Sequence, residues 1–524
     1  MKIRGKWGKL RNDWEKIFGI FLSCLHFIVA FCIIESACYE RKYPDMDELI
    51  NEVPQPPVRR QRKKRSKFQI FKEAYLPIVI VALAVILVIT FIVGSVGRAV
   101  DKRKAEKEAS IASSESIALQ EAEWLAESQR LLAGAEELAA ELNYEAAVDL
   151  IDSFSGDASK YPDLSAKRAE YVKIMSELVV YSDPAAIPHL SFQMLVADPA
   201  RAFVDEDFGD AYNRNYVTTD EFAKILQQLY DNNYMLVSVR DLIEETPEGK
   251  FAAGKISLPV GKKPIVLSQV AANYFTYMTD GNEDGLPDAE GDGFPYCLAL
   301  DAEGNFVSKM IAADGNEVTG NLDFVTILEA FIKEHPDFSY QGARAILAVT
   351  GYDGIFGYRT DGDTRDEQGS EYYAQQLSGA QQVVDALKDA GYDLACNSYE
   401  NVSYADSSVE LIQGDLLMWT EEVTPILGDI DILVYPYGDD LTENVSDAYE
   451  GDKFQELHNA GFRFFIGMDN ETAASAQVNP NYFRQTRRWV TGAKMAYASD
   501  IYTDLFNAST VLSSERGEVP AEVE

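Results

Sequence analysis

The larger, C-terminal part of the chain predicts an α/β fold, built either as a barrel or as a doubly wound sheet. Two observations support this. From about Ile187 onward, short apolar runs of strand length alternate with amphipathic segments of helix length. The first of these helices starts at Thr219 and Asp220, residues that can cap a helix. Such alternation favours parallel strands, whose carboxyl ends form the place where ligands bind.

The individual elements follow from the same pattern. The predicted strands are Pro264–Ser268, Ala345–Thr350, Asp393–Ser398, Asp431–Tyr435 and Phe462–Met468. The predicted helices are Thr219–Asn232, Asp323–Glu334, Glu371–Ala390, Val409–Ile426 and Lys453–Ala460. The polar tail, residues 513–524, is expected to be disordered.

Charge is distributed unevenly along the 524 residues. The net charge is -38, with 85 acidic and 47 basic residues. Residues 1–104 contain 20 Lys and Arg against 10 Asp and Glu, so this part is about +10 and the remainder about -48. An acidic bulk of this size repels nucleic acid and excludes it as a partner. It suits a soluble domain outside a cell.

One segment predicts a membrane anchor. Residues 74–97 carry no charge and are long enough to cross a bilayer core as a helix. The stronger basic cluster lies on the N-terminal side of this run, within residues 59–72. The positive-inside rule therefore predicts a single-pass protein of the cell membrane, with residues 1–73 cytoplasmic and the large domain extracytoplasmic.

An earlier apolar run, residues 17–34, is a weaker candidate. It contains His26, and if it also crossed the membrane the basic tail Lys2–Lys16 would lie outside. Two interpretations stay open. The run is a signal peptide, or the native chain starts at Met46.

Residues 98–182 predict a helical stalk. This segment is rich in Ala, Glu, Leu and Lys, with apolar residues at helical spacing. Breaks at Gly156 and Pro162 divide it into a long helix, a short one at Glu145–Phe154 and a third at Leu164–Val180. A helical hairpin is therefore expected before the α/β domain.

Several motifs carry a resemblance to a known family. They are IPHLSFQMLVADPARAF, PIVLSQVAANYF, TGYDGIFGYRT, VVDALKDAGYDLACNSYENVS, LVYPYG and RQTRRW, in that order between Ile187 and Asn507. In order and spacing the chain resembles the membrane-anchored polysaccharide deacetylases with a NodB-homology domain. The resemblance implies a distorted (β/α) barrel over residues 187–510. It also implies a metal-dependent hydrolase that removes acetyl groups from N-acetylated glycans.

The catalytic positions of that family are changed in this chain. The family has two adjacent aspartates where Val270 and Ala271 stand, and two histidines where Asn397 and Asn401 stand. A neutral amide is a poor metal ligand and an aliphatic side chain is none. No cofactor is therefore expected at this site. Of the histidines in the domain, only His189 lies on a segment expected to approach the pocket.

The resemblance also points to a remaining pocket wall. Tyr435, Pro436 and Tyr437 match the family's Pro-Tyr substrate loop, and Arg484 and Trp489 are expected to follow the last barrel strand. Aromatic faces and a guanidinium can hold a sugar of the cell wall or cell surface. The alternative is that these residues only shape the barrel end.

A separate loop has the ligand spacing of a calcium site. Asp280, Asn282, Asp284 and Asp288 place oxygen atoms at alternate positions around Gly285. The alternative is an acidic surface loop. Two cysteines, Cys297 and Cys396, lie in the same domain and are expected to be free, partly buried thiols rather than a disulfide.

Three functions follow. The favoured one is a pseudoenzyme at the cell surface that binds envelope glycan or acts as a scaffold. The alternatives are an active deacetylase that recruits other ligands, and a structural envelope protein with an inert barrel. No feature of the sequence identifies a protein partner.

Overall fold

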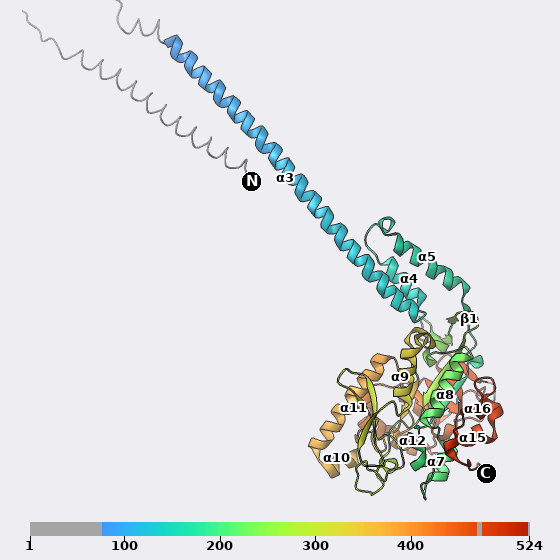
Figure 1. Cartoon of the computed structure of the whole chain (residues 1–524). Helices are drawn as coiled ribbons and strands as arrows, with labels where there is room; N and C mark the ends of the chain where they lie inside the picture. Colours follow the sequence, from blue (N-terminus) through green and yellow to red (C-terminus); the bar gives the residue numbers. More distant parts are fainter. Residues whose placement is uncertain (1–75, 469–473, 522–524) are drawn as a thin grey trace, which may run out of the picture. The chain divides into compact units, whose positions relative to one another are not determined.

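The computed structural model describes residues 76–468 and 474–521, so the N-terminal region and the apolar run at 17–34 lie outside the described residues. The chain divides into two compact units, Met1–Glu108 and Ala109–Glu524. The first helix to be described, α3, runs without interruption from Leu76 to Ala140 (Figure 1). Among the described residues it is the one helix long and apolar enough to cross a membrane. No part of its apolar segment is buried against the rest of the protein.

The predicted span is therefore not a separate helix. Its described part and the first stalk helix form one continuous α3, because Gly94 and Gly97 are followed by strong helix formers and by no proline. In the second unit, α4 (Tyr144–Asp152) and α5 (Pro162–Glu177) lie beside the end of α3 (Figure 1). A small apolar cluster joins the three helices through Leu131, Ala135, Ile151, Leu164 and Tyr171.

The predicted third stalk helix is too long at its C-terminal end. It ends at Glu177, and Val179–Tyr181 forms strand β1, which pairs with β6 (Ile256–Leu258). Val179 and Val180 are β-branched and so favour a strand over a helix.

Seven parallel strands form a closed barrel, which confirms the predicted α/β class. Its strands are β2 (His189–Phe192), β7 (Lys263–Gln269), β11 (Ile346–Val349), β12 (Asp393–Cys396), β13 (Ile432–Val434), β14 (Phe464–Met468) and β16 (Tyr482–Trp489). The order around the wall is β11-β12-β13-β14-β16-β2-β7. The pairs Ile346↔Ser268 and Leu347↔Gln269 join β11 to β7 and close the circle.

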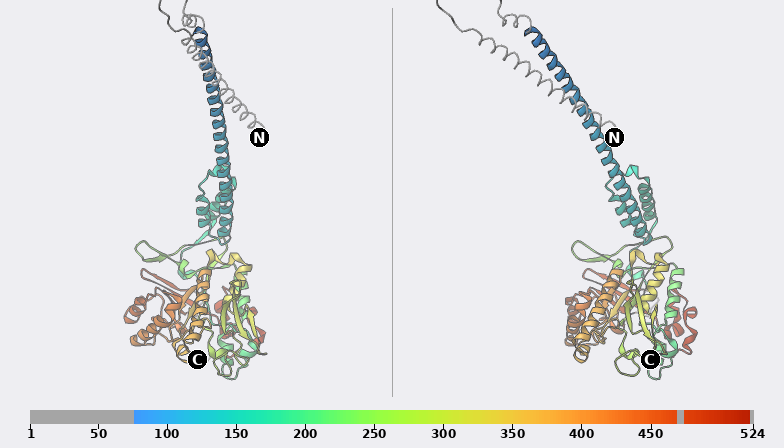
Figure 2. Two further views of the ribbon diagram at one scale, coloured as in Figure 1. Left: turned by 90° about the vertical axis from the view of Figure 1, so that its left-hand side faces the viewer. Right: turned by 60° about the vertical axis from the view of Figure 1, so that its left-hand side comes forward.

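Successive strand residues point alternately into and out of the barrel. Val266, Ala348 and Ile466 belong to a buried cluster in the interior. Their neighbours, such as Leu267 and Phe465, pack in a second cluster together with the surrounding helices. Those helices include α8 (Thr219–Asp231), α9 (Phe324–Glu334), α11 (Ser370–Ala390), α12 (Val409–Met418) and α14 (Asp452–Asn459), and they lie outside the strands in the views of Figure 2.

Two parts of the domain differ from the prediction. Strands β8 (Cys297–Leu300), β9 (Phe306–Ile311) and β10 (Glu317–Gly320) form an unpredicted antiparallel sheet inserted between β7 and α9. The motif RQTRRW does not follow the last barrel strand but lies within it, as part of β16. Cys297 and Cys396 are both free and buried, as expected.

The C-terminal tail is ordered from Ser513 to residue 521, contrary to the expected disorder. Arg516 and Glu221 form an ion pair at 2.6 Å in which both side chains are fully buried. Glu221 also belongs to the capping box of α8, whose N-cap is Thr218 rather than the expected Thr219. Arg516 further donates to the backbone carbonyl and side-chain oxygen of Asn213. The polar tail is thus ordered because the buried carboxylate of Glu221 requires the guanidinium of Arg516 as its partner.

Replacing Arg516 with Met should therefore destabilise the whole domain. The substitution leaves the Glu221 carboxylate buried and without its cation, which costs about 3 to 5 kcal/mol in the free energy of unfolding. Urea unfolding of the full chain in detergent, followed by tryptophan fluorescence, measures the change. The exposed neighbour Glu515 offers a control, since Glu515→Gln should change stability by less than about 0.5 kcal/mol. Equal stability of both variants would contradict the role given to this ion pair.

Candidate functional site

A small cavity lies at the carboxyl end of the barrel, where strand ends β2, β7, β12, β14 and β16 meet. Its volume is about 60 Å³. We call it the barrel mouth, and it is lined by Ser191, Gln193, Val270, Ala271, Asn397, Asn401, Tyr437, Met468, Arg487 and Trp489. The four positions predicted from the family resemblance, Val270, Ala271, Asn397 and Asn401, therefore line one cavity.

Two residues of the mouth have an unusual backbone conformation. Ala271 and Asn401 both have left-handed backbone conformations, with φ of 51° and 54°. Asparagine tolerates the left-handed region, whereas the Cβ of alanine makes it sterically unfavourable. Val270 is held by its backbone N–H, which donates to the Phe192 carbonyl at 2.9 Å. The strained position at Ala271 is one that an aspartate would occupy at lower cost.

The two asparagines act as structural donors. The Asn397 amide nitrogen donates to the Val434 carbonyl at 2.8 Å, and that of Asn401 donates to the Tyr437 hydroxyl at 3.1 Å. Within the residues that the structure describes, no group of three or more His, Cys, Asp or Glu side chains is placed to hold a metal. Aliphatic and amide side chains at these positions do not fit the metal that the family resemblance implies.

A buried arginine occupies the mouth instead. Arg487 is 4% exposed, and its guanidinium donates to the backbone carbonyls of Ile466 at 2.8 Å and of Tyr435 at 3.0 Å. Burial lowers the pKa of Arg487 to about 10, which still leaves it charged at neutral pH. Among the described residues it forms no ion pair within 4.0 Å. Arg484 was the arginine predicted from the same motif, whereas Arg487 is the one that lines the mouth.

Arg484 faces the wrong way for substrate binding. Residues 485, 487 and 489 of β16 point into the barrel, so Arg484 points outward. It is paired with Asp440 at 2.8 Å and lies over the Tyr449 ring at 4.0 Å. Its function is to fix the segment outside β16. Trp489, predicted from the same motif, does line the mouth.

Of the Tyr-Pro-Tyr segment, only Tyr437 reaches the mouth. Tyr435 is fully buried on the outside of the barrel, where its hydroxyl donates to that of Tyr449 at 3.1 Å, and Pro436 is buried as well. Tyr437 is 59% exposed and lines the cavity. The expected pocket wall therefore reduces to Tyr437 and Trp489.

His189 lies inside the barrel below the mouth. Its ring nitrogens are bonded to Gln485 Oε1 at 3.2 Å and to Ser268 Oγ at 2.8 Å. Burial, and then the charge of Arg487, lower its pKa to about 3, while the hydrogen bond with Gln485 acts in the opposite direction. His189 is thus a neutral core residue and does not line the cavity.

The predicted calcium loop turns its side chains toward its own backbone. Asp280 accepts from the N–H of Asp284 at 3.2 Å, and Asp288 accepts from the N–H groups of Gly281, Asn282, Glu290 and Gly291. Asn282 and Asp284 accept similar bonds. Such turns need no ion, although the same oxygens could ligate one, and calcium at Asp280, Asn282, Asp284 and Asp288 stays a prediction.

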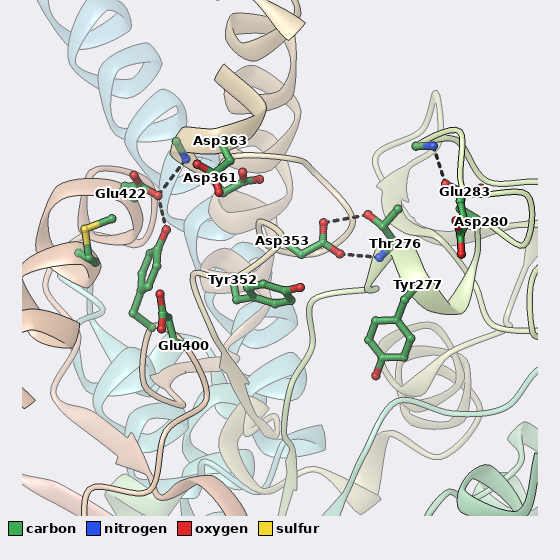
Figure 3. A pocket seen from close by; sticks show the side chains of 14 residues that line it. Thr276, Tyr277, Asp280, Glu283, Tyr352, Asp353, Asp361, Asp363, Glu400 and Glu422 are labelled. Carbon is green, nitrogen blue, oxygen red and sulfur yellow. Dashed lines mark hydrogen bonds between the residues drawn. The ribbon is translucent and has the colours of Figure 1, made fainter. Parts of the chain in front are cut away.

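The loop borders a second, acidic cleft of about 710 Å³ (Figure 3). Seven carboxylates line it, among them Asp280, Asp353 and Glu422. Several are engaged locally: Asp353 accepts from the Thr276 hydroxyl at 2.8 Å, and Glu422 accepts from the Gly362 N–H at 3.0 Å. The first contact joins the loops that follow β7 and β11, and the second joins the segment after β11 to the helical turn Trp419–Val423.

Replacing Ala271 with Gly should stabilise the protein, which is unusual for a glycine substitution. Glycine adopts φ of 51° without the steric cost that an alanine Cβ meets, so the free energy of unfolding should rise by about 1 kcal/mol. The neighbouring Ala272→Gly is the control: Ala272 is buried and has no positive φ, and the change should destabilise. Urea unfolding distinguishes the two, and a loss of stability in both variants would contradict the strain at Ala271.

His189 should make the protein less stable in mild acid. The unfolded chain binds a proton at this residue below about pH 6.5, whereas the folded chain resists it down to about pH 3. Stability is therefore lost as the pH falls through this window, by about 2 kcal/mol between pH 7 and pH 5. His189→Gln, which cannot be protonated, should lose correspondingly less over the same range. If the free energy of unfolding decreases equally with pH in the two proteins, the histidine of the folded protein is protonated as readily as that of the unfolded chain.

Comparisons with known proteins assign no family. No family model matches the chain, and no curated protein matches it. Among solved structures, the chain is similar to a Streptococcus pyogenes deacetylase, PplD, determined in complex with acetate. The match has 13% sequence identity and a TM-score of 0.31, and it covers 62% of this chain and 98% of that chain.

Proposed function

We propose that this chain is a cell-surface protein of the polysaccharide deacetylase type that has lost its catalysis and binds envelope glycan, as a receptor or scaffold. One observation carries the proposal: the barrel mouth is lined by Val270, Ala271, Asn397 and Asn401, with the cation Arg487 beside them. Metal-dependent deacetylation needs anionic or imidazole ligands to hold the ion that activates water. A mouth with neutral side chains and a fixed positive charge disfavours that ion.

The same mouth retains groups that suit a sugar. The exposed ring of Tyr437 can lie against a sugar face, and the amides of Gln193 and Asn401 can exchange hydrogen bonds with hydroxyl groups. The cavity of about 60 Å³ is far smaller than the volume a sugar ring requires. A ring would therefore rest on Tyr437 at the rim, with only a substituent entering the cavity.

The proposed location is the cell membrane, with α3 as a single anchor and the barrel domain extracytoplasmic. The apolar segment of α3 and the stronger basic cluster on its N-terminal side support this orientation. An extracytoplasmic barrel would meet wall and surface glycans directly.

The proposal predicts glycan binding without acetate release. The full chain in detergent should release no acetate from acetylated chitooligosaccharides or peptidoglycan, with or without added zinc. It should retain these glycans in a binding assay, and Tyr437→Ala should weaken the affinity about tenfold through the lost ring contact. Tyr352→Ala is the matched control, because Tyr352 is 58% exposed but lines the acidic cleft rather than the mouth.

Two outcomes would contradict the proposal. Acetate release that a chelator abolishes would show an active hydrolase. Binding that is lost in Tyr352→Ala but not in Tyr437→Ala would move the glycan site to the acidic cleft. The combined variant Val270→Asp, Ala271→Asp, Asn397→His and Asn401→His tests the barrel itself, since it should gain stoichiometric zinc if these positions are correctly matched.

A further inference from the structure

The interior of the barrel mouth carries a positive charge for which the described residues, 76–468 and 474–521, provide no counterion. The Arg487 guanidinium is almost fully buried, and its partners are the backbone carbonyls of Tyr435, Ile466 and Gly467. Within the described ranges, no carboxylate lies within 4.0 Å of it. Carbonyl groups satisfy the hydrogen bonds but do not neutralise the charge, and a buried charge of this kind is normally paired.

Two further donors in the mouth have no acceptor among the residues that the structure describes. Ser191 is completely buried and lines the cavity, yet its Oγ has no hydrogen-bond partner in the part of the chain that the structure describes. The indole Nε1 of Trp489, another lining residue, is buried and equally without a partner. Native proteins leave few buried polar groups unsatisfied, so two in one small cavity require an explanation.

The three donors come together through the register of two strands. Trp489 of β16 lies directly opposite Ser191 of β2 in the parallel pairing. Arg487 is two residues before Trp489 and therefore points to the same side of the wall. A guanidinium, a hydroxyl and an indole N–H thus line one cavity, and none of the lining residues has a carboxylate.

We propose that the barrel mouth is a carboxylate site that recognises an acidic sugar by its carboxyl group. Arg487 supplies the charge, and the Ser191 hydroxyl and the Trp489 N–H are the donors that meet the carboxylate oxygens. This inference rests on the proposed glycan binding and adds to it a preference for glycans that carry a carboxyl group, such as polyuronates or sugars with a lactyl ether.

The size of the cavity supports a carboxyl group as the part that enters. About 60 Å³ is the volume of roughly two water molecules in the liquid. A carboxylate occupies a similar space, whereas a sugar ring would remain outside on Tyr437. The many carboxylates elsewhere on the domain repel an anionic ligand. Salt screens this repulsion over distances greater than about 8 to 10 Å. Arg487 acts at contact and is screened much less.

Calorimetric titration of the full chain in detergent tests the inference with three probes. They are trigalacturonate, its methyl ester, which has the same ring and no charge, and free acetate. Trigalacturonate should bind at least tenfold more tightly than the ester. Ser191→Ala should weaken trigalacturonate binding about tenfold and leave ester binding unchanged, because only the charged group uses the hydroxyl.

Ser191→Ala is the decisive variant because it removes an unpartnered hydroxyl and should not harm folding. Arg487→Met should abolish the preference for the acid. It also removes hydrogen bonds to three carbonyl groups, so its result supports the carboxylate site only if Ser191→Ala gives the same change in binding. Ser339→Ala is the matched control. Ser339 is also buried, donates to the Ala343 carbonyl at 2.8 Å and is not among the residues of the mouth, so binding should not change.

Equal binding of acid and ester would overturn the carboxylate site and leave the proposed glycan binding intact. Binding of acetate without trigalacturonate would overturn the acidic sugar as the ligand. Failure of trigalacturonate, its ester and neutral chitooligosaccharides alike would overturn the proposed function itself. A preference for the acid that survives Ser191→Ala would place the anion elsewhere on the domain.

Discussion

Closure of the barrel depends on the pairing of β7 with β11, the strands at the two ends of the seven-stranded wall. Two residue pairs, Ile346↔Ser268 and Leu347↔Gln269, join these strands and turn an open sheet into a closed circle. Once the circle is closed, the register of every strand determines which side chains point inward. The composition of the mouth follows from that register, because the carboxyl ends of β2, β7, β12, β14 and β16 meet there.

Closure also separates the residues that fill the barrel from those that line its mouth. The interior is filled by Val266, Ala348, Val434 and Ile466, which lie within the strands. Val270, Ala271, Asn397 and Asn401 lie beyond the ends of β7 and β12, where a substitution leaves the interior packing untouched. Ala271 has a left-handed backbone conformation, which an alanine side chain does not favour. The backbone conformation of the loop after β7 is therefore determined by the strands that hold the loop and not by the side chain of Ala271.

The sequence predicted much of this architecture. Five of the seven barrel strands were found because they are apolar runs, buried on both faces. The motifs also located Val270, Ala271, Asn397 and Asn401, which share one cavity. Strand β16 was missed as a strand because arginines and a glutamine interrupt its apolar pattern.

The remaining errors have the same physical origin: sequence reasoning cannot tell which face of a strand looks inward until its bounds and register are known. Arg484 and Arg487 are equivalent in the motif, and only the alternation along β16 separates them. Tyr435 was misplaced for the same reason. The tail looked disordered because it is polar, and its order depends on an ion pair between residues 295 positions apart.

The ion pair of Arg516 with Glu221 has a consequence for the biosynthesis of the domain. Ribosomes make Glu221 first, and nearly 300 further residues must follow before its cation exists. The strand β16, which lies between β14 and β2 in the wall, is also made late. Until β16 and Arg516 have been made, a nascent chain can neither close the wall between β14 and β2 nor bury Glu221 with its cation. Closure of the barrel and capping of α8 by its distant partner are therefore late events in the synthesis of this domain.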